Sequence, residues 1–256
     1  MSRQVLATLL DQACDAALEI LSPTRCAGCE RPGALVCERC LHELRLIDPS
    51  LSCTRCGAPF GSLVCTECTP LQEGAAPPIA RAPERVLAMA EFAEPLARMI
   101  RAYKDAGERR LAPLFAEMLL DTAEHAEAVA PERYGGILSD ADAVSFVPAT
   151  ASAFRRRGFD HMELPAHHLC ELAGKPLLDA LAKHGASDQR ALGREGRRRE
   201  ALGAYEVVAD VAGMRVLLID DVVTTGATVT AAADALIGAG ARHVDALSLA
   251  RVVGGS

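Results

Sequence analysis

The segment Val216–Thr228 holds the residues of this chain whose types and spacing could do chemistry. Its apolar first part, Val216–Ile219, predicts a buried parallel strand that ends in two carboxylates, Asp220 and Asp221. A turn rich in hydroxyl groups and small residues follows, and Val229–Ile237 then have helical spacing. Because open α/β sheets bind ligands beyond the carboxyl ends of their strands, we predict a ligand site at this turn.

The residues of the turn indicate what the ligand is. Ionised carboxylates only accept hydrogen bonds, so Asp220 and Asp221 suit two neighbouring hydroxyl groups of a ribose. Backbone N–H groups at the start of a helix, with threonine hydroxyls beside them, suit a phosphate. We therefore predict a ribose 5-phosphate site with Asp220 and Asp221 as catalytic residues. The predicted phosphate contacts are Val223, Thr224, Thr225, Gly226, Ala227 and Thr228.

The order of these residues resembles the signature of type I phosphoribosyltransferases, which bind phosphoribosyl pyrophosphate (PRPP) with magnesium. Two alternatives are a phosphoacceptor domain, which needs only the acid pair, and a structural turn capped by Thr225. The strand–turn–helix context and the run Thr-Thr-Gly-Ala-Thr favour the sugar-phosphate site over both. The resemblance implies an α/β fold, a doubly wound parallel sheet of the type I phosphoribosyltransferase kind.

Composition narrows the class of protein. The chain has 256 residues, of which 50% are hydrophobic, enough for one ordinary core and a small module. A net charge of −7 argues against a general electrostatic attraction to nucleic acid or anionic membranes. Asp11, Asp15 and Glu19 interrupt the apolar N-terminal stretch, and no uninterrupted apolar run reaches bilayer length. We therefore expect no membrane span and a cytoplasmic location.

Eight of the 10 cysteines form four Cys-x-x-Cys pairs, which predict two structural zinc sites with four cysteine ligands each. Disulfides are the alternative in a secreted domain, but no export signal is present. Sequential grouping of the pairs needs shorter loops and is favoured, although spacing alone leaves a crossed arrangement open. The predicted ligands are Cys26, Cys29, Cys37 and Cys40, then Cys53, Cys56, Cys65 and Cys68. Cys14 and Cys170 are expected to be small buried hydrophobes.

Four regions follow along the chain: an N-terminal amphipathic helix (1–23), a double zinc ribbon (24–70), a linker (71–84) and a phosphoribosyltransferase-like domain (85–256). Strands alternate with helices in the last region, which predicts a doubly wound sheet. The expected strands are 86–92, 143–147, 176–181, 205–208, 216–219 and 243–250. The expected helices are 95–103, 111–130 with a break, 162–173 and 229–237.

A transferase of this type also needs a pyrophosphate loop, cations and a cover. The loop is predicted at 147–152, where Ala149 and Thr150 allow close approach, or else it is an ordinary turn capped by Ser152. Lys104 and the run Arg155–Arg157 supply the predicted cations, because ammonium and guanidinium groups pair with diphosphate oxygens. Within the run Arg157, next to Gly158, is the favoured residue, and a solvated charged face is the alternative. The polar, arginine-rich stretch 187–203 is the expected cover, with a disordered basic loop or a nucleic-acid contact as alternatives.

Four Cys-x-x-Cys pairs followed by such a domain resemble the ComF family, which is linked to DNA uptake in natural competence and includes amidophosphoribosyltransferase-like and GntX-like proteins. The matching positions are Tyr103-Lys104, Arg157-Gly158-Phe159, Gln189, Leu192, Gly203-Ala204-Tyr205, the Asp220-Asp221 signature and Ala250-Arg251. This resemblance places Gln189 in the pyrophosphate and cover region. The chain departs from the family pattern at Ala149-Thr150 and at Asp160-His161, where the family has Val-Pro and Asn-Gln.

The resemblance implies a protein that binds PRPP or a ribose 5-phosphate nucleotide with magnesium, in connection with DNA uptake. Transfer of phosphoribose to an acceptor would make it a pentosyltransferase, and the drifted pyrophosphate region makes binding a more direct implication than turnover. The main alternative is a non-catalytic module that binds single-stranded DNA or a DNA-uptake helicase. A third is a PRPP-sensing regulator, although no DNA-reading helix is evident.

Overall fold

The computed structural model describes residues 24–59, 65, 68, 83–183 and 204–253. The predicted N-terminal helix (1–23), most of the linker (71–84) and the cover (187–203), with Gln189, lie outside these residues. A four-stranded parallel sheet has the order β1-β6-β5-β2. Its strands are Val86–Glu91 (β1), His243–Arg251 (β6), Arg215–Val223 (β5) and Ala143–Phe146 (β2).

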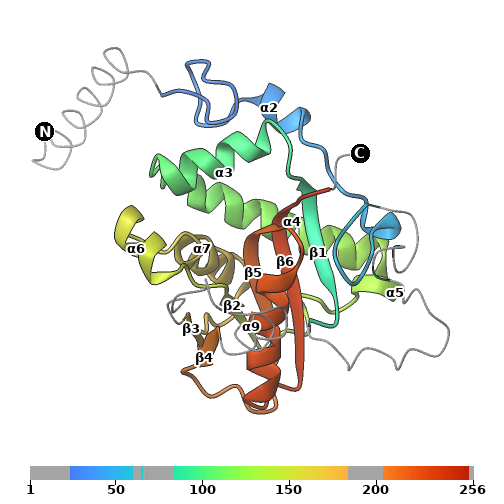
Figure 1. Ribbon diagram of the computed structural model, residues 1–256. Coiled ribbons are helices and arrows are strands. Elements are labelled where there is room, and N and C mark those ends of the chain that lie inside the picture. Colours follow the sequence, from blue (N-terminus) through green and yellow to red (C-terminus); the bar gives the residue numbers. More distant parts are fainter. Residues whose placement is uncertain (1–23, 60–64, 66–67, 69–82, 184–203, 254–256) are drawn as a thin grey trace, which may run out of the picture.

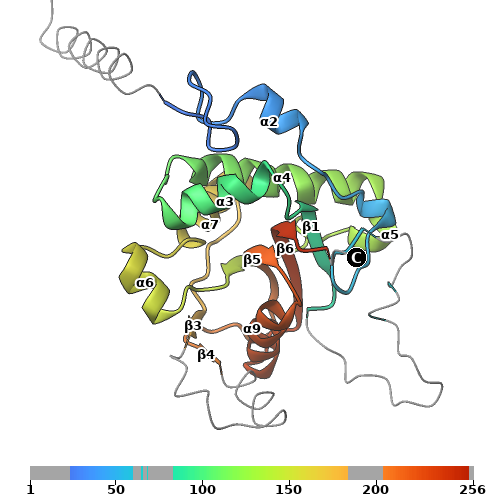
Figure 2. The ribbon, with the colours of Figure 1, turned by 45° about the horizontal axis from the view of Figure 1, so that its top comes forward.

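Helices cover both faces of this sheet, as Figure 2 shows. One face packs against α3 (Leu96–Asp105), α4 (Leu111–Val129) and α7 (Glu163–Ala173), and the other against α9 (Ala227–Gly238). Successive residues of β5 serve opposite faces: Leu217 and Ile219 join the core under α4, and Val216 and Leu218 the core under α9. The predicted doubly wound α/β fold is therefore confirmed.

Helix α4 differs from its prediction because it runs without a break from Leu111 to Val129. Its buried residues recur every three or four positions, as in Leu111, Phe115 and Leu119, and form one continuous apolar stripe. Pro113 lies in the first turn, where a helix has no use for the N–H group that proline lacks. The helix is followed by a short α5 (Pro131–Tyr134).

The predicted loop 147–152 gives way at Ala151 to a helix that the sequence pattern did not reveal, α6 (Ala151–Arg157). Thr150, not Ser152, caps its start, since the Thr150 hydroxyl accepts the Ala153 N–H at 3.1 Å. Gly158, with φ of 75°, ends it in the left-handed conformation. None of its residues is buried, so it has no apolar periodicity to detect.

The strand expected at 176–181 is reduced to one bridge, between Leu177 and Val144. The residues just after it, Leu181–Lys183 (β3), instead pair antiparallel with Tyr205–Val207 (β4) in a separate two-stranded sheet. This small sheet carries the two ends of the segment that contains the predicted cover.

Residues 45–51, between the two groups of cysteines, cover the open edge of β1. In Figure 1 the chain runs from α2 (Glu38–His42), above α3, along the side of β1 toward α5. The Ile47 N–H donates to the Met89 carbonyl, and the Glu91 N–H donates to the Arg45 carbonyl, both at 2.9 Å. A short helix, η1 (Pro49–Leu51), follows. Backbone bonding thus joins the segment between the two groups of cysteines to the edge of the sheet.

Candidate functional site

The predicted acid pair lies at the carboxyl end of β5, between β6 and β2 in the sheet. Asp220 and Asp221 are each only 6% exposed. Asp220 Oδ1 accepts the Asp221 N–H at 2.9 Å, and Asp221 Oδ1 accepts the Val222 N–H at 2.8 Å. The strand end therefore fixes both carboxyl groups at the edge where parallel sheets bind ligands.

Two cationic side chains from distant parts of the chain surround Asp221. Lys104 Nζ, from the end of α3, donates to Asp221 Oδ2, and His161 Nε2 lies 3.6 Å from Asp221 Oδ1. Burial opposes ionisation of Asp221, but the His161 and Lys104 interactions outweigh it and hold the pKa of Asp221 well below its usual range. Asp221 is thus an ionised acceptor at neutral pH.

Asp220 has the opposite character. Burial, reinforced by the negative charge of Asp221, raises the pKa of Asp220 to about 8. Lys183 of β3 and Tyr205 of β4 are further electrostatic neighbours of Asp220. Both acids were predicted to act as acceptors. The raised pKa favours the protonated form of Asp220 in the ligand-free site, and a protonated carboxyl group can donate a hydrogen bond.

His161 and Asp160 complete the surroundings of the acids. Asp160 Oδ2 accepts the Ala149 N–H at 2.6 Å, and Asp160 Oδ1 accepts the Met162 N–H at 2.9 Å. Burial lowers the pKa of His161, but Asp160 and Asp221 outweigh it and raise that pKa above its ordinary value. In the sequence these two residues stand out only as a departure from the family pattern, so their place in the site was not predicted.

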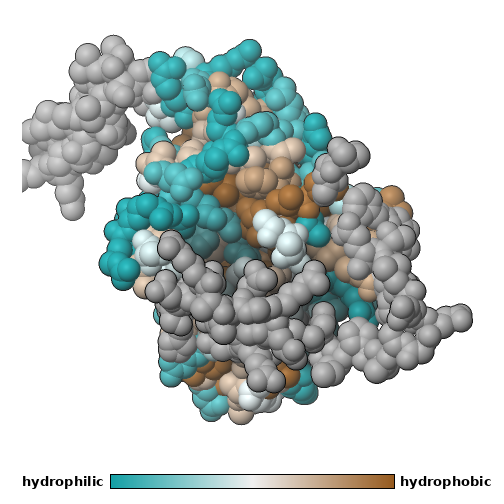
Figure 3. Space-filling view, in the orientation of Figure 1, coloured by the Kyte–Doolittle hydropathy of each residue, from teal (hydrophilic) through white to brown (hydrophobic). Residues whose placement is uncertain are grey.

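The turn after the acids is built as a phosphate cradle would require. Thr224, Thr225 and Thr228 are exposed, and Gly226, with φ of 78°, leads the chain into α9. Among the described residues, no acceptor bonds the N–H groups of Thr225, Gly226 and Thr228. Figure 3 shows the face of the molecule seen in Figure 1, where the surface is apolar in the centre and hydrophilic over α6. The first amides of α9 are therefore available to an anion.

A basic pocket of about 490 Å³ adjoins the acid pair. Lys104, Arg156, Arg157 and Phe159 line it. The Arg157 side chain is 13% exposed, lies 3.7 Å from Asp105, and has a buried Nε without a hydrogen-bond partner among the described residues. The structure thus brings the two predicted cations, Lys104 and Arg157, into one pocket.

The other residues assigned to pyrophosphate have different surroundings. The Ala149 amide is bonded to Asp160, and the Thr150 hydroxyl caps α6. Both contacts are made within the protein and hold the loop in place. Neither residue lines the basic pocket. Gln189 lies outside the described residues.

The acid pair also meets the requirement for a cation site. Ligand atoms of His161, Asp220 and Asp221 lie within 4.8 Å of one another. Magnesium prefers oxygen ligands, so the two carboxylates fit it and the imidazole does not.

The eight paired cysteines form two groups, which confirms the sequential arrangement. The first Cys₄ module (residues 24–44) contains Cys26, Cys29, Cys37 and Cys40. The second (residues 52–59, 65 and 68) contains Cys53, Cys56, Cys65 and Cys68.

Sulfur–sulfur distances in these groups fit a metal site rather than disulfides. The pairs Cys26–Cys40, Cys29–Cys37 and Cys56–Cys65 are each separated by 3.7 Å between Sγ atoms. A tetrahedral zinc with bonds of about 2.3 Å sets its sulfurs about 3.8 Å apart, whereas a disulfide needs about 2.0 Å. Both groups could therefore hold zinc. Cys170 is buried apart from them, as expected, and Cys14 lies outside the described residues.

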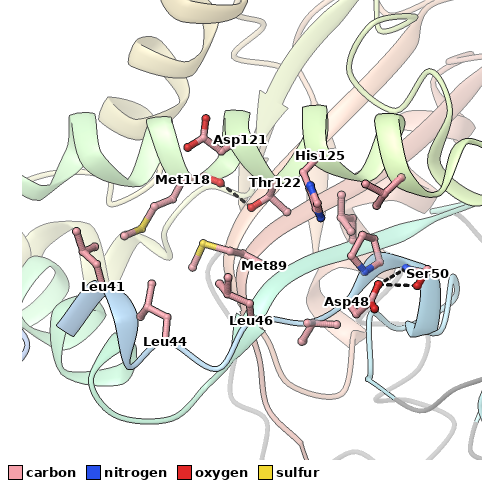
Figure 4. Close-up of a pocket in the computed structure, with 14 residues that line it drawn as sticks. Leu41, Leu44, Leu46, Asp48, Ser50, Met89, Met118, Asp121, Thr122 and His125 are labelled. Carbon is pink, nitrogen blue, oxygen red and sulfur yellow. Dashed lines mark hydrogen bonds between the residues drawn. The ribbon is translucent and has the colours of Figure 1, made fainter. Parts of the chain in front are cut away.

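A larger groove of about 800 Å³ lies apart from the acid pair, between α4, β1 and residues 41–50 (Figure 4). Leu41, Leu44, Leu46, Met89 and Met118 give it an apolar lining, and neither acid contributes to it. Its chemistry does not suit a sugar phosphate. Among the described residues, no helix is long and apolar enough to cross a membrane.

Comparison with known proteins agrees with the geometry. Residues 178–253 match the family described as phosphoribosyl transferase domain, and this range includes the acids and the turn. The DNA utilization protein YhgH of Escherichia coli O157:H7 is 30% identical over 243 residues, which are 90% of this chain and 98% of that protein. The YhgH protein of Salmonella typhi is 29% identical over 240 residues, with the same coverage.

A solved structure, that of the allosteric regulatory enzyme of purine biosynthesis, aligns with 54% of this chain and 25% of its own. Its identity is 21% and its TM-score 0.36, too low to support an inference. The identity to YhgH across almost the whole of that protein is decisive. Together with the phosphoribosyl transferase match and the two Cys₄ groups, it shows that this chain belongs to the ComF family.

Proposed function

We propose that this protein binds PRPP, or another ribose 5-phosphate compound, with magnesium at the carboxyl end of β5. The observation that carries the proposal is the set of unbonded amides at Thr225, Gly226 and Thr228 directly after a buried acid pair. A helix start with such amides favours a phosphate, and carboxyl groups one strand-end away favour sugar hydroxyls. A ribose 5-phosphate group presents both a phosphate and neighbouring sugar hydroxyls.

Each side chain then has a role. The turn amides and threonine hydroxyls bind the 5-phosphate, and Asp221, as the ionised acid, accepts from a ribose hydroxyl. Lys104 and Arg157 in the basic pocket bind the pyrophosphate. Magnesium would be held by the carboxylates and by ligand oxygens, and would supply positive charge to the departing pyrophosphate.

Transfer of the phosphoribosyl group is the catalytic form of this proposal. An acceptor nucleophile forms a bond to the anomeric carbon while the bond to pyrophosphate breaks, and the cationic pocket stabilises the charge on the leaving group.

We also propose zinc as the structural metal of both Cys₄ modules and a connection with DNA uptake. Four thiolates leave no open coordination position for catalysis, which favours a structural role. The connection with DNA rests on the name of the YhgH relatives.

Calorimetry tests the main proposal. Ribose 5-phosphate and PRPP, each with and without magnesium, are titrated into the wild-type chain, Asp221→Asn and Asp179→Asn. Asp179 is an exposed aspartate outside the site and serves as the matched control. We expect Asp221→Asn to weaken binding about tenfold or more, since a charged hydrogen bond is lost, and Asp179→Asn to bind like the wild type. Equal binding by all three proteins, or none by the wild type, would remove the proposal.

A second candidate function, binding of single-stranded DNA, is favoured by helix α6. This helix ends in Arg155, Arg156 and Arg157, buries no residue and leaves Phe154 48% exposed. Positive charge beside an exposed aromatic ring is the combination that binds single strands. Binding of a single-stranded oligonucleotide that weakens with salt, and weakens further in Phe154→Ala with Arg155→Gln, is the result expected of this function.

A further inference from the structure

The Arg251 side chain connects two parts of the molecule that are 195 residues apart in sequence. Arg251 is the last residue of β6 and is 7% exposed. Its Nε donates to the Cys56 carbonyl at 2.7 Å, inside the second Cys₄ module. Its Nη1 lies 3.4 Å from the Val223 carbonyl and closer to that of Thr224, in the phosphate turn. One planar group thus contacts both the metal module and the turn.

This guanidinium has little freedom to move. Its partners are carbonyl oxygens, including that of Val252, and no ion pair with a carboxylate is found among the described residues. Guanidinium donors point in fixed directions within one plane, so a shift of one carbonyl leaves a buried donor without its partner. An unpaired buried donor is costly. The position of the Cys56 carbonyl therefore constrains the position of the turn.

The second module holds that carbonyl against the sheet by close backbone contacts. The Thr54 carbonyl accepts the Val86 N–H of β1 at 2.7 Å. Gly57, with φ of 71°, lies so close to β1 that a Cβ there would be 3.2 Å from the Ala88 Cβ. Cys56 lies between these residues, and its sulfur belongs to the metal group. A metal ion bound to Cys53 and Cys56 fixes the turn that presents this carbonyl.

We infer that the metal ion in the second Cys₄ module and the phosphoribosyl ligand stabilise each other through Arg251, which acts as a positioning residue for the phosphate turn. The inference rests on the proposed function and adds to it a coupling between two sites. Because such coupling is reciprocal, a metal that improves ligand binding must itself be held more tightly when the ligand is bound. The first module has no described contact with the turn and should show no coupling.

The ligand half of the test measures binding of ribose 5-phosphate to the full metal-loaded chain by calorimetry. Arg251→Gln is expected to bind at least fivefold more weakly, and Arg251→Lys at an intermediate level because an ammonium cannot reach all the carbonyls. Arg242→Gln is the matched control, an exposed arginine just before β6. Circular dichroism and thermal melts establish that each variant is folded.

The metal half follows release of metal to a chromophoric chelator with and without ribose 5-phosphate. Cys29→Ser disables the first module, so the remaining release comes from the second. We expect the ligand to slow release from the second module about threefold or more, and to lose this effect when Arg251→Gln is added. In the chain with both modules intact, the part of the release that Cys29→Ser removes should not respond to the ligand.

The outcomes separate the two claims. A wild-type chain that does not bind ribose 5-phosphate overturns the proposed function and the inference with it. A wild-type chain that binds, but releases metal at the same rate with and without ligand, overturns the coupling alone. Weaker binding by Arg251→Gln without any change in metal release would also overturn the coupling, because Arg251 would then only shape the turn.

Discussion

The two Cys₄ modules have the same ligands and the same Cys-x-x-Cys pairs, yet they differ in their attachment to the fold. The first packs four partly buried apolar side chains against the core, those of Ala27, Leu35, Val36 and Leu44. Its polar contacts with the helical layer are exposed: an ion pair of 3.3 Å between Arg98 and Glu30, and a 3.3 Å hydrogen bond from Arg110 to the Thr24 hydroxyl. The polar contacts of the second module, with α5 and with the sheet, are buried. Ser52 Oγ and Tyr134 Oη are 2.7 Å apart, and Arg251 donates to the Cys56 carbonyl.

This difference shows that a ligand pattern specifies a metal site but not what the site does for the rest of the protein. Both modules keep their sulfurs at the spacing of a tetrahedral ion. Only the second, however, has hydrogen bonds to β1 and to the carbonyl network around the phosphate turn. Loss of metal from the first should be felt locally, and loss from the second throughout the phosphoribosyltransferase domain.

The largest expected difference is between Cys56→Ser and Cys29→Ser. A structural zinc site contributes on the order of 10 kcal/mol to folding of its own module. We expect Cys56→Ser to lower the Tm of the whole chain by about 10 °C or more, because the module is fixed to the core. Cys29→Ser should lower it by less than about 3 °C. Thermal unfolding followed by circular dichroism, with zinc content measured in parallel, checks this. Equal shifts would mean that the attachments described above do not matter.

A smaller contrast is expected between Gly57→Ala and Gly33→Ala. Both glycines have positive φ, 71° and 113°, so alanine is strained at either. At Gly57 the added methyl group also meets Ala88, whereas nothing lies within 4 Å at Gly33. We expect a cost of about 2–4 kcal/mol at Gly57 and about 1–2 kcal/mol at Gly33, measured by urea unfolding. A larger cost at Gly33 would contradict the tight seating of the second module.

A smaller difference in stability is expected when one polar contact is removed from each module. Tyr134→Phe leaves the buried Ser52 hydroxyl without its side-chain partner, at a cost of about 1–2 kcal/mol. Arg98→Ala removes an exposed ion pair, which is worth less than about 1 kcal/mol. Chemical denaturation of the two variants at low and high salt measures both losses of stability. High salt should reduce only the loss in Arg98→Ala.

The last contrast lies within the acid pair, where a change leaves both metal modules intact. The pKa of Asp220 is raised on folding to about 8, so stability falls as pH rises from the unfolded pKa of about 4 toward 8. Asp220→Asn should therefore stabilise the protein more at pH 8 than at pH 5, because an asparagine has no charge to bury.

Asp221→Asn is the matched opposite for that experiment. The pKa of Asp221 is lowered on folding, so its contribution is present above pH 4 and is lost as pH falls through the folded pKa. Asp221→Asn should destabilise the protein at pH 7. Melts of both variants between pH 5 and 8, with metal release as a control for the modules, test the signs. If Asp220→Asn stabilised the protein no more at pH 8 than at pH 5, the pKa of Asp220 would not be raised by folding.

Local patterns made the central part of the site predictable. A buried strand, two acids and a helix start stand next to one another in the chain, so β5, the turn and α9 follow from adjacent residues. Cysteine spacing likewise defines a knuckle within four residues. The sequential grouping of the pairs could be favoured because short loops close more easily.

The remaining features depend on contacts between distant residues or on helices without an apolar face. His161 enters the site only because the start of α7 is brought to the end of β5. Arg251 matched the family at a strand end, but its bond to Cys56 needs the whole sheet. Helix α6 is defined by its caps rather than by burial, and β3 pairs with β4 across more than 20 intervening residues. Periodicity could not indicate any of these.

The strand order β1-β6-β5-β2 has a consequence for how the chain is made by the ribosome. The strand that joins β1 to the rest of the sheet, β6, is the last one synthesised, so among the described residues β1 has no parallel partner strand until residues 243–251 have emerged. All eight paired cysteines emerge well before that point and can acquire metal first. Arg251 closes β6, so the final step of sheet assembly also brings the phosphate turn against a module that is already loaded.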